Sequence, residues 1–257
     1  EIPGMLHATF LRSDYAHAII KNIDISEALK HPGVVAVYTA EEMGDYWKPG
    51  PLQVPPPTAI AGSQFNARTL PPLGKGKVRY SGEPIAIVVA ESRYIAEDAC
   101  EDIIFDAEPL DAVCDLEKAW EDTSVLVHDD LPSNMAALVK QESGNYEEAK
   151  KNADVVVSRK FYANRVAGAA MENRGLVVDW DDRNQEMTVW ATVQAPLPLR
   201  STIAGRMGLV ENQVRVLNPF IGGGFGPKVM TSQADDVLLP WIAMKLNRPI
   251  KWIEDRR

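Results

Sequence analysis

The sequence is poor in the residues that bind metals or cross-link chains. Its 257 residues include two cysteines, Cys100 and Cys114, and four histidines. The cysteines form no CxxC pair and the histidines match no HExxH pattern, which disfavours a zinc site made of protein ligands. Two cysteines are also too few to hold an iron–sulfur cluster within this chain. Isolated thiols are typical of a reducing compartment, so we expect a cytoplasmic protein.

Long apolar runs and positive charge are also lacking. No run approaches the roughly 20 residues of a membrane span, and residues 1–4 lack the features of a secretory signal. The net charge is −9, which argues against a general nucleic-acid binder because such a protein needs a basic face for phosphates. The chain begins with Glu1 rather than Met, so we expect a processed chain or a fragment.

The composition that remains is that of a globular protein, and residues 1–115 predict a compact first domain of strands and helices. Residues 84–90 (PIAIVVA) form a β-rich apolar run, which predicts a strand buried on both faces. Ser92 follows at the position of a helix N-cap. Residues 47–76 are rich in Pro and Gly and predict a long loop. We expect strands at 6–11, 34–38, 84–90 and from 103, and helices at 26–30 and 94–100.

Residues 116–150 are more polar and predict a connector with a short helix at 146–151. A second, strand-rich domain is expected from 151 to 257, with a hairpin loop at 181–184. The last predicted strand has no evident partner in the sequence, so we expect the domain to continue or another chain to complete its sheet. We expect strands at 155–162, 176–180, 187–193, 214–217 and 250–253, and helices at 198–207 and 232–246.

The strongest local signal is the run Gly222-Gly223-Gly224-Phe225-Gly226 followed by Pro227-Lys228. Successive glycines remove side chains where a backbone must bend or approach a ligand closely. A strand before this run and a helix after it make it a loop whose amides can face an anion. The ending fits neither a P-loop nor a dinucleotide-binding fingerprint. A tight turn without a ligand is an equally good interpretation of the spacing alone.

Other enzyme signals are weaker. Gln194 is expected at a strand end, where its amide can donate to an oxo or hydroxo group, although an ordinary turn glutamine is the favoured interpretation of this residue taken alone. Glu172 and Arg174 can pair or bridge to another segment, and a structural ion pair is the favoured interpretation. No GxSxG elbow occurs and neither cysteine has a histidine nearby in the sequence, so a nucleophilic hydrolase has no support.

Taken together, several segments resemble the large subunit of the xanthine dehydrogenase and aldehyde oxidase family, which includes aerobic carbon monoxide dehydrogenase. Met171-Glu172-Asn173-Arg174 is similar to the family's Met-Glu-Pro-Arg, with Asn173 in place of the usual proline. The resemblance implies a mixed α/β (α+β) fold, with an α/β hammerhead domain followed by the first part of a molybdopterin-binding domain. The segments that carry it are 4–8, 11–18, 78–86, 94–99, 171–175 and 194–226.

The resemblance also implies a site. Gln194 would hydrogen-bond an oxygen ligand of molybdenum, and Phe225 with the backbone of Gly224 and Gly226 would line the pterin-bearing metal centre. The cofactor's dithiolene would hold the metal, so no protein ligand is expected. The cofactor would be molybdopterin, for which the cytosine dinucleotide form is one candidate. The family's general base lies in a later segment, so the catalytic residues of this chain stay unknown.

The reaction implied is the hydroxylation of an aldehyde or N-heterocycle, with water as the oxygen source. Electrons would pass to [2Fe-2S] and FAD on an iron–sulfur subunit and an FAD subunit, and the remaining molybdenum-domain polypeptide would be a further partner. This chain alone would therefore be inactive. Purine-hydroxylating members carry a glutamate after the lysine, where this chain has Val229, which puts xanthine in doubt. Carbon monoxide oxidation, reduction of an aromatic thioester and a non-catalytic binding or assembly module are the alternatives.

Overall fold

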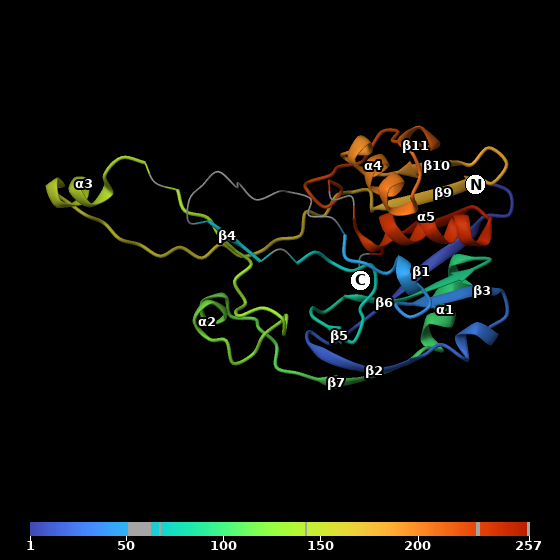
Figure 1. The fold of residues 1–257 in the computed structure, drawn as a ribbon, viewed down its shortest axis with the longest axis horizontal. Coiled ribbons are helices and arrows are strands. Elements are labelled where there is room, and N and C mark those ends of the chain that lie inside the picture. The colour runs from blue at the N-terminus through green and yellow to red at the C-terminus, as the bar shows by residue number, and fades with distance from the viewer. Residues whose placement is uncertain (51–62, 67, 142, 230–231, 256–257) are drawn as a thin grey trace.

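The computed structural model describes residues 1–50, 63–66, 68–141, 143–229 and 232–255, and its largest unit is a seven-stranded mixed sheet (Figure 1). Strands from both halves of the chain form this sheet, in the order β11-β10-β9-β12-β1-β6-β3. The bounds of these strands are β1 (Leu6–Arg12), β3 (Val34–Thr39), β6 (Pro84–Ala90), β9 (Gly175–Asp181), β10 (Glu186–Ala191), β11 (Val214–Leu217) and β12 (Ile250–Ile253).

Strand β6 is buried along its whole length because both of its faces are covered. Ala86, Val88 and Ala90 pack into a cluster with helix α1 (Arg93–Glu101). Ile87 and Val89 face the main core on the opposite side. This alternation is the period-two pattern of a strand, and it confirms the prediction of a strand buried on both faces. Ser92 caps α1, since its side chain accepts a hydrogen bond from the Ile95 amide, as predicted.

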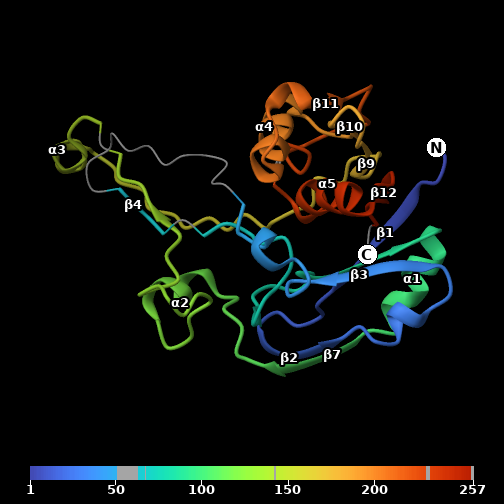
Figure 2. The ribbon, with the colours of Figure 1, turned by 45° about the vertical axis from the view of Figure 1, so that its right-hand side comes forward.

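A second sheet has three strands, in the order β5-β2-β7. It lies in the first half of the chain, on the same side of the main sheet as α1. In Figure 2, helix α5 lies on one side of β3 and the β2–β7 pair lies on the other. The three strands are short and partly exposed, and their small core contains Ala18, Val78 and Ile85. Their bounds are β2 (Ala18–Asp24), β5 (Lys77–Val78) and β7 (Ile104–Pro109), and two 3-10 turns, η1 (Ala28–Lys30) and η2 (Gly44–Tyr46), complete this half.

The second half contributes two helices to the main core. Helix α4 (Pro196–Met207) ends at Gly208, whose φ of 70° gives the left-handed C-cap expected of glycine. Helix α5 (Ala234–Leu246) is buried through most of its length and continues through Pro240. A 3-10 turn, η3 (Glu211–Gln213), precedes β11. Both helices pack on the seven-stranded sheet and so bring the loops around residues 194 and 226 to one end of it.

The connector extends away from the body of the molecule as an arm, with α3 at its far end (Figure 1). Its predicted short helix is confirmed, whereas α2 was not foreseen. The long loop predicted at 47–76 is in another part of the chain. It falls partly on residues 51–62 and 67, which are outside the described residues. The elements here are α2 (Leu116–Glu121), α3 (Tyr146–Asn152) and the paired strands β4 (Gln64–Phe65) and β8 (Ala137–Leu138).

Two strand predictions were wrong. Residues 155–162 form no strand, although their composition favours one, because no neighbouring strand in the described part of the chain pairs with them. The prediction that β12 lacks a partner was also wrong, because β12 lies between β1, to which it is parallel, and β9, to which it is antiparallel. The seven-stranded sheet therefore crosses the predicted domain boundary. None of the described helices is long and apolar enough to cross a membrane.

Candidate functional site

Gln194 lies just beyond the end of β10 and is attached to the glycine-rich loop by two hydrogen bonds. Its amide N–H donates to the Lys228 carbonyl at 2.8 Å. Its side-chain Oε1 accepts from the Gly226 amide at 3.3 Å. The second bond fixes which way the amide group faces, so Nε2 is the donor left for another partner. The structure thus brings Gln194 and the loop together.

Gly224 lies so close to Gln194 that any other residue at this position would displace the Gln194 side chain. A Cβ on Gly224 would lie 2.2 Å from Gln194 Cδ and 2.5 Å from Oε1. Gly222 is crowded in the same way, because its Cβ would lie 2.6 Å from the Cβ of Glu172. These two glycines are required by close approach, which is one of the two reasons that the sequence suggested for the run.

Phe225 is held in an unusual backbone conformation. Its φ is +50°, in the left-handed region that glycine adopts readily and aromatic residues rarely do. Its side chain is 73% exposed, so burial of the ring does not compensate for the strain. Its backbone packs against Gly168, where a Cβ would lie 3.2 Å from the Phe225 carbonyl oxygen. Strain of this kind persists where surrounding contacts enforce it, and it is common at ligand sites.

The amides of Gly223, Gly224 and Phe225 donate no hydrogen bond within the described parts of the chain. Successive unpaired amides in a bend of this shape form a concave, partly positive surface. Together with the free Nε2 of Gln194, they supply donors to an acceptor-rich ligand. The residues present therefore fit a pterin cofactor with oxygen and phosphate acceptors.

Glu172 and Lys228 fix the two ends of the loop. Glu172 Oε2 accepts hydrogen bonds from Lys228 Nζ and from the Gly222 amide, both at 2.8 Å. The Lys228 side chain is only 2% exposed, whereas the Glu172 side chain is 38% exposed. The hydrogen bond from Lys228, followed by that from Gly222, lowers the pKa of Glu172. The Glu172 carboxylate therefore stays ionised, and its ion pair with Lys228 joins the start of the loop to its end.

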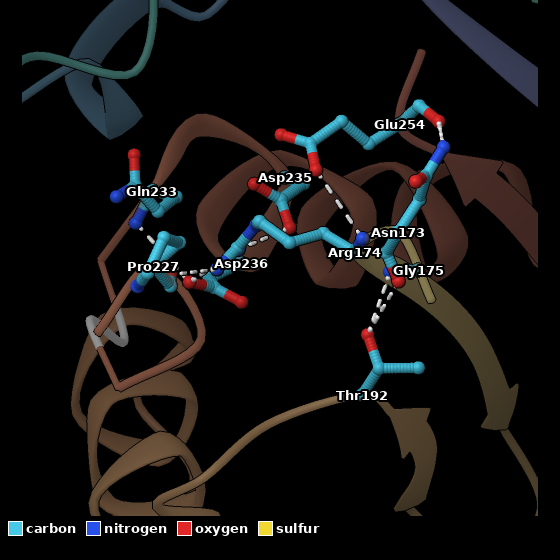
Figure 3. Close-up of polar contacts among 9 residues, drawn as sticks. All are labelled: Asn173, Arg174, Gly175, Thr192, Pro227, Gln233, Asp235, Asp236 and Glu254. Atoms are coloured by element: carbon cyan, nitrogen blue, oxygen red, sulfur yellow. Dashed lines mark hydrogen bonds and ion pairs between the residues drawn. The ribbon is translucent and has the colours of Figure 1, made fainter. Parts of the chain in front are cut away.

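Arg174 forms a second, more deeply buried ion pair, and Figure 3 shows its partners. Its guanidinium donates to the Pro227 carbonyl at 2.9 Å and to Asp235 Oδ2 at 2.6 Å, and Asp236 Oδ2 lies 3.4 Å away. Burial alone would lower the pKa of Arg174, but the charges of the two aspartates raise it above its ordinary value. Glu172 and Arg174 thus each bridge to other segments and do not pair with each other.

Sequence reasoning did not identify the partners of these two residues. Lys228 was noted only as part of the glycine-rich motif, and Asp235 and Asp236 lie in the predicted helix at 232–246 without a role of their own. One signal could have found the aspartates: two adjacent carboxylates at the beginning of an almost wholly apolar helix require a buried cation.

A hollow of about 350 Å³ lies beside the loop. Its walls combine small residues of the approach to β9 with the charged side chains described above. The site thus has a concave wall next to the loop amides. Among the described residues, no group of three or more His, Cys, Asp or Glu side chains is arranged to hold a metal ion. The hollow is lined by residues including Gly168, Ala170, Glu172, Arg174, Gly224 and Lys228.

Comparison with known families gives two matches that together cover most of the chain. Residues 1–111 match the aldehyde oxidase and xanthine dehydrogenase a/b hammerhead domain, and residues 127–257 match the molybdopterin cofactor-binding domain. These matches confirm the predicted fold class, a hammerhead domain followed by molybdopterin-binding sequence. The boundaries at 115 and 150 stay predictions.

Individual relatives agree with this. The chain is 36% identical over 256 residues to the nicotine 6-hydroxylase large subunit of Paenarthrobacter nicotinovorans, covering 100% of the chain and 30% of that protein. It is 35% identical to the carbon monoxide dehydrogenase large chain of Afipia carboxidovorans, covering 100% of the chain and 32% of that protein. The crystal structure of quinoline 2-oxidoreductase from Pseudomonas putida 86 superposes with a TM-score of 0.88 at 32% identity, covering 100% of the chain and 32% of that structure. The chain thus spans about a third of the length of these relatives.

Proposed function

The chain belongs to the aldehyde oxidase and xanthine dehydrogenase family of molybdenum hydroxylases, and from this premise we propose that its loop at 222–226 and Gln194 form one wall of a molybdopterin site. The observation that carries the proposal is the contact between the Gln194 amide group and the backbone of Gly224 and Gly226. This contact brings a free side-chain donor next to the three free backbone amides of the loop. We propose Gln194, Gly224, Phe225 and Gly226 as the residues that contact the cofactor.

Each of these residues has a distinct role in the proposal. Gln194 uses Oε1 to hold the Gly226 amide and directs Nε2 toward an oxygen ligand of the metal. Gly224 leaves room for the Gln194 side chain next to the loop backbone, and Phe225 presents an exposed ring beside the cofactor. When bound, the cofactor supplies the metal centre at which water provides the oxygen for hydroxylation of a substrate carbon. The general base is assigned to polypeptide outside this sequence.

We propose an N-heterocycle or an aldehyde as the substrate. Nicotine 6-hydroxylase and quinoline 2-oxidoreductase are both named for N-heterocyclic substrates, and both are similar to this chain over its whole length. Val229, directly after Lys228, places an apolar side chain where purine-hydroxylating members carry glutamate. A carbon monoxide dehydrogenase-like activity is the second candidate, because the chain is similar to that large chain at nearly the same identity.

The proposal includes partners. Remaining molybdenum-domain polypeptide would close the site, and [2Fe-2S] and FAD on separate subunits would carry electrons away. Two unpaired cysteines cannot hold a cluster here, which supports separate electron carriers. Residues 155–162 expose Val155, Val157, Phe161 and Tyr162, each more than three-quarters exposed, which supports a covering polypeptide. We place the assembly in the cytoplasm and expect this chain alone to be inactive.

The test is to purify the complex that contains this chain and to compare it with the Q194A variant. We expect molybdenum near one equivalent per chain, flavin and iron–sulfur absorption bands, and turnover of an N-heterocycle or an aldehyde. Q194A should keep the metal but lose about 100-fold in kcat, as when one donor to a developing charge is removed. The matched control is Q141A, which changes an exposed glutamine of the connector. Full turnover in metal-replete Q194A would contradict the proposal. A complex without molybdenum, iron and flavin would also contradict it, and would favour an assembly module.

A further inference from the structure

Three segments that are far apart in the sequence meet at Arg174. The residue lies directly before β9 and is only 8% exposed. Its side chain reaches the Pro227 carbonyl in the glycine-rich loop and both aspartates in the first turn of α5. Its backbone amide donates to Glu254 Oε2 at 3.2 Å, and its carbonyl accepts from the Glu254 amide at 3.0 Å. Figure 3 shows Arg174 between these segments.

The two aspartates do more than cap a helix. Carboxylates at a helix start are stabilised by the helix dipole at the surface, where water also solvates them. Asp235 and Asp236 are only 5% and 3% exposed, so they depend on Arg174 for compensation. Their carboxyl oxygens in turn fix the guanidinium, because a buried arginine between two such acceptors has no other favourable orientation. The guanidinium is therefore held in one orientation. Its Nη2 contacts the two aspartates, and its Nη1 is left to donate to the Pro227 carbonyl in the loop.

The loop carbonyl that this nitrogen holds is close to the proposed cofactor contacts. Pro227 follows Gly226, whose amide donates to Gln194. The next carbonyl, that of Lys228, accepts from the Gln194 backbone amide. Two consecutive loop carbonyls are thus fixed, one by Arg174 and one by Gln194. A shift at Pro227 would move both the Phe225–Gly226 bend and the side chain of Gln194.

We propose that Arg174, with Asp235 and Asp236 as its fixed hydrogen-bond acceptors, is a positioning residue that anchors the Pro227 carbonyl and thereby orients Gln194 and the 224–226 backbone toward the cofactor. This inference rests on the proposed function for its consequence in catalysis. The anchoring itself is a property of this chain. Lysine cannot replace arginine here, because a single ammonium lacks the planar fork that spans a carbonyl and two carboxylates.

The experiment compares R174K with the R93K control in the full complex. Arg93 also contacts two carboxylates, those of Glu97 and Asp255, but it lies on the surface and makes no contact with the loop. Amide hydrogen exchange measured by mass spectrometry reports on peptides 222–229. We expect R174K to speed exchange in these peptides by about tenfold or more, as when one charge-assisted hydrogen bond is lost, while R93K leaves them unchanged.

Catalysis provides the second readout. In metal-replete R174K we expect kcat to fall about tenfold with KM little changed, because a mispositioned Gln194 affects the reacting state more than substrate binding. Loop exchange equal to wild type would overturn the inference, as would faster exchange spread evenly over the strands, since that is the signature of general destabilisation. Where R174K does not fold, D235N carries the same test, because it keeps an acceptor oxygen and removes the charge.

The outcomes separate this inference from the proposed function. A wild-type complex without molybdenum would contradict the proposed function. The exchange measurement would still test whether Arg174 anchors the loop at Pro227. Faster loop exchange in R174K with unchanged kcat in a molybdenum-loaded enzyme would overturn the positioning role alone.

Discussion

The side chain of Gln194 occupies the space that a side chain on Gly224 would need, with its Cδ 2.2 Å from the position of a Cβ there. We predict that G224A displaces the Gln194 side chain and lowers stability by about 1 kcal/mol, the low end of the cost of overpacking, because this exposed side chain can move aside. It should also abolish most of the turnover, because Nε2 of Gln194 no longer faces the cofactor. Chemical denaturation of the chain and assay of the complex test the two effects.

The control for this substitution is G205A. Gly205 lies inside α4, and nothing lies within 4 Å of the position of its Cβ. Alanine should stabilise a helix interior by about 0.5–1 kcal/mol at such a site. Equal stability changes in G224A and G205A would show that the contact between Gln194 and Gly224 is not tight.

Phe225 provides a test of backbone strain. Because its φ is +50°, glycine should be more stable than alanine at this position, by about 1 kcal/mol. F225G and F225A both remove the exposed ring, so their difference isolates the backbone. The control is Tyr94, which is 77% exposed in α1, where Y94A should be more stable than Y94G. The same order at both positions would refute the left-handed conformation of Phe225.

Part of this arrangement can be predicted from the sequence, and part cannot. The apolar run of β6 and the Ser92 cap follow from local patterns, and both are confirmed. The glycine-rich loop and Gln194 were identified as candidates for the same reason. Local patterns carry no information on pairing at long range, so the position of β12 between β1 and β9 was missed.

Residues 155–162 illustrate the opposite error. Their β-branched and aromatic side chains favour a strand, but a strand needs a neighbour to accept its backbone hydrogen bonds, and the described chain offers none. The bond between Arg174 and Asp235 spans 61 positions and could not be identified from spacing. The adjacent aspartates at the start of an apolar helix indicate only that a buried cation lies near them, not which residue supplies it.

The Glu172–Lys228 pair should respond unequally to removal of its two members. Lys228 is 2% exposed and Glu172 is 38% exposed in their side chains. E172A leaves a buried ammonium without a partner and should cost about 3–5 kcal/mol. K228M leaves a carboxylate that water can reach, so its cost should be smaller by at least about 1 kcal/mol. Urea unfolding of both variants measures the difference, and equal costs would contradict the asymmetric burial.

The stability of the protein should depend on pH through Asp236. Burial, followed by the charge of Asp235, raises the pKa of Asp236 to about 8. The folded chain therefore holds a proton that the unfolded chain releases near pH 4, so this contribution to stability is lost as pH rises toward 8. His7 and His128, whose pKa values are lowered mainly by burial, act in the opposite direction below about pH 6.5.

The window that isolates Asp236 is therefore about pH 6.5–8. Over this range the free energy of unfolding of the wild type should fall with pH, and that of D236N should fall less. Asparagine keeps an oxygen that can accept from the Gln233 amide, as Asp236 does at 3.1 Å, so the helix cap is preserved. Parallel pH profiles for the two proteins would mean that Asp236 is ionised throughout this range.

A cryo-electron microscopy map of the complete complex tests the central claim most directly. The account predicts pterin density against the backbone of Gly224–Gly226, with an oxygen ligand of the metal within hydrogen-bonding distance of Gln194 Nε2. Cofactor density at another surface of the chain, with Gln194 facing solvent, would contradict it.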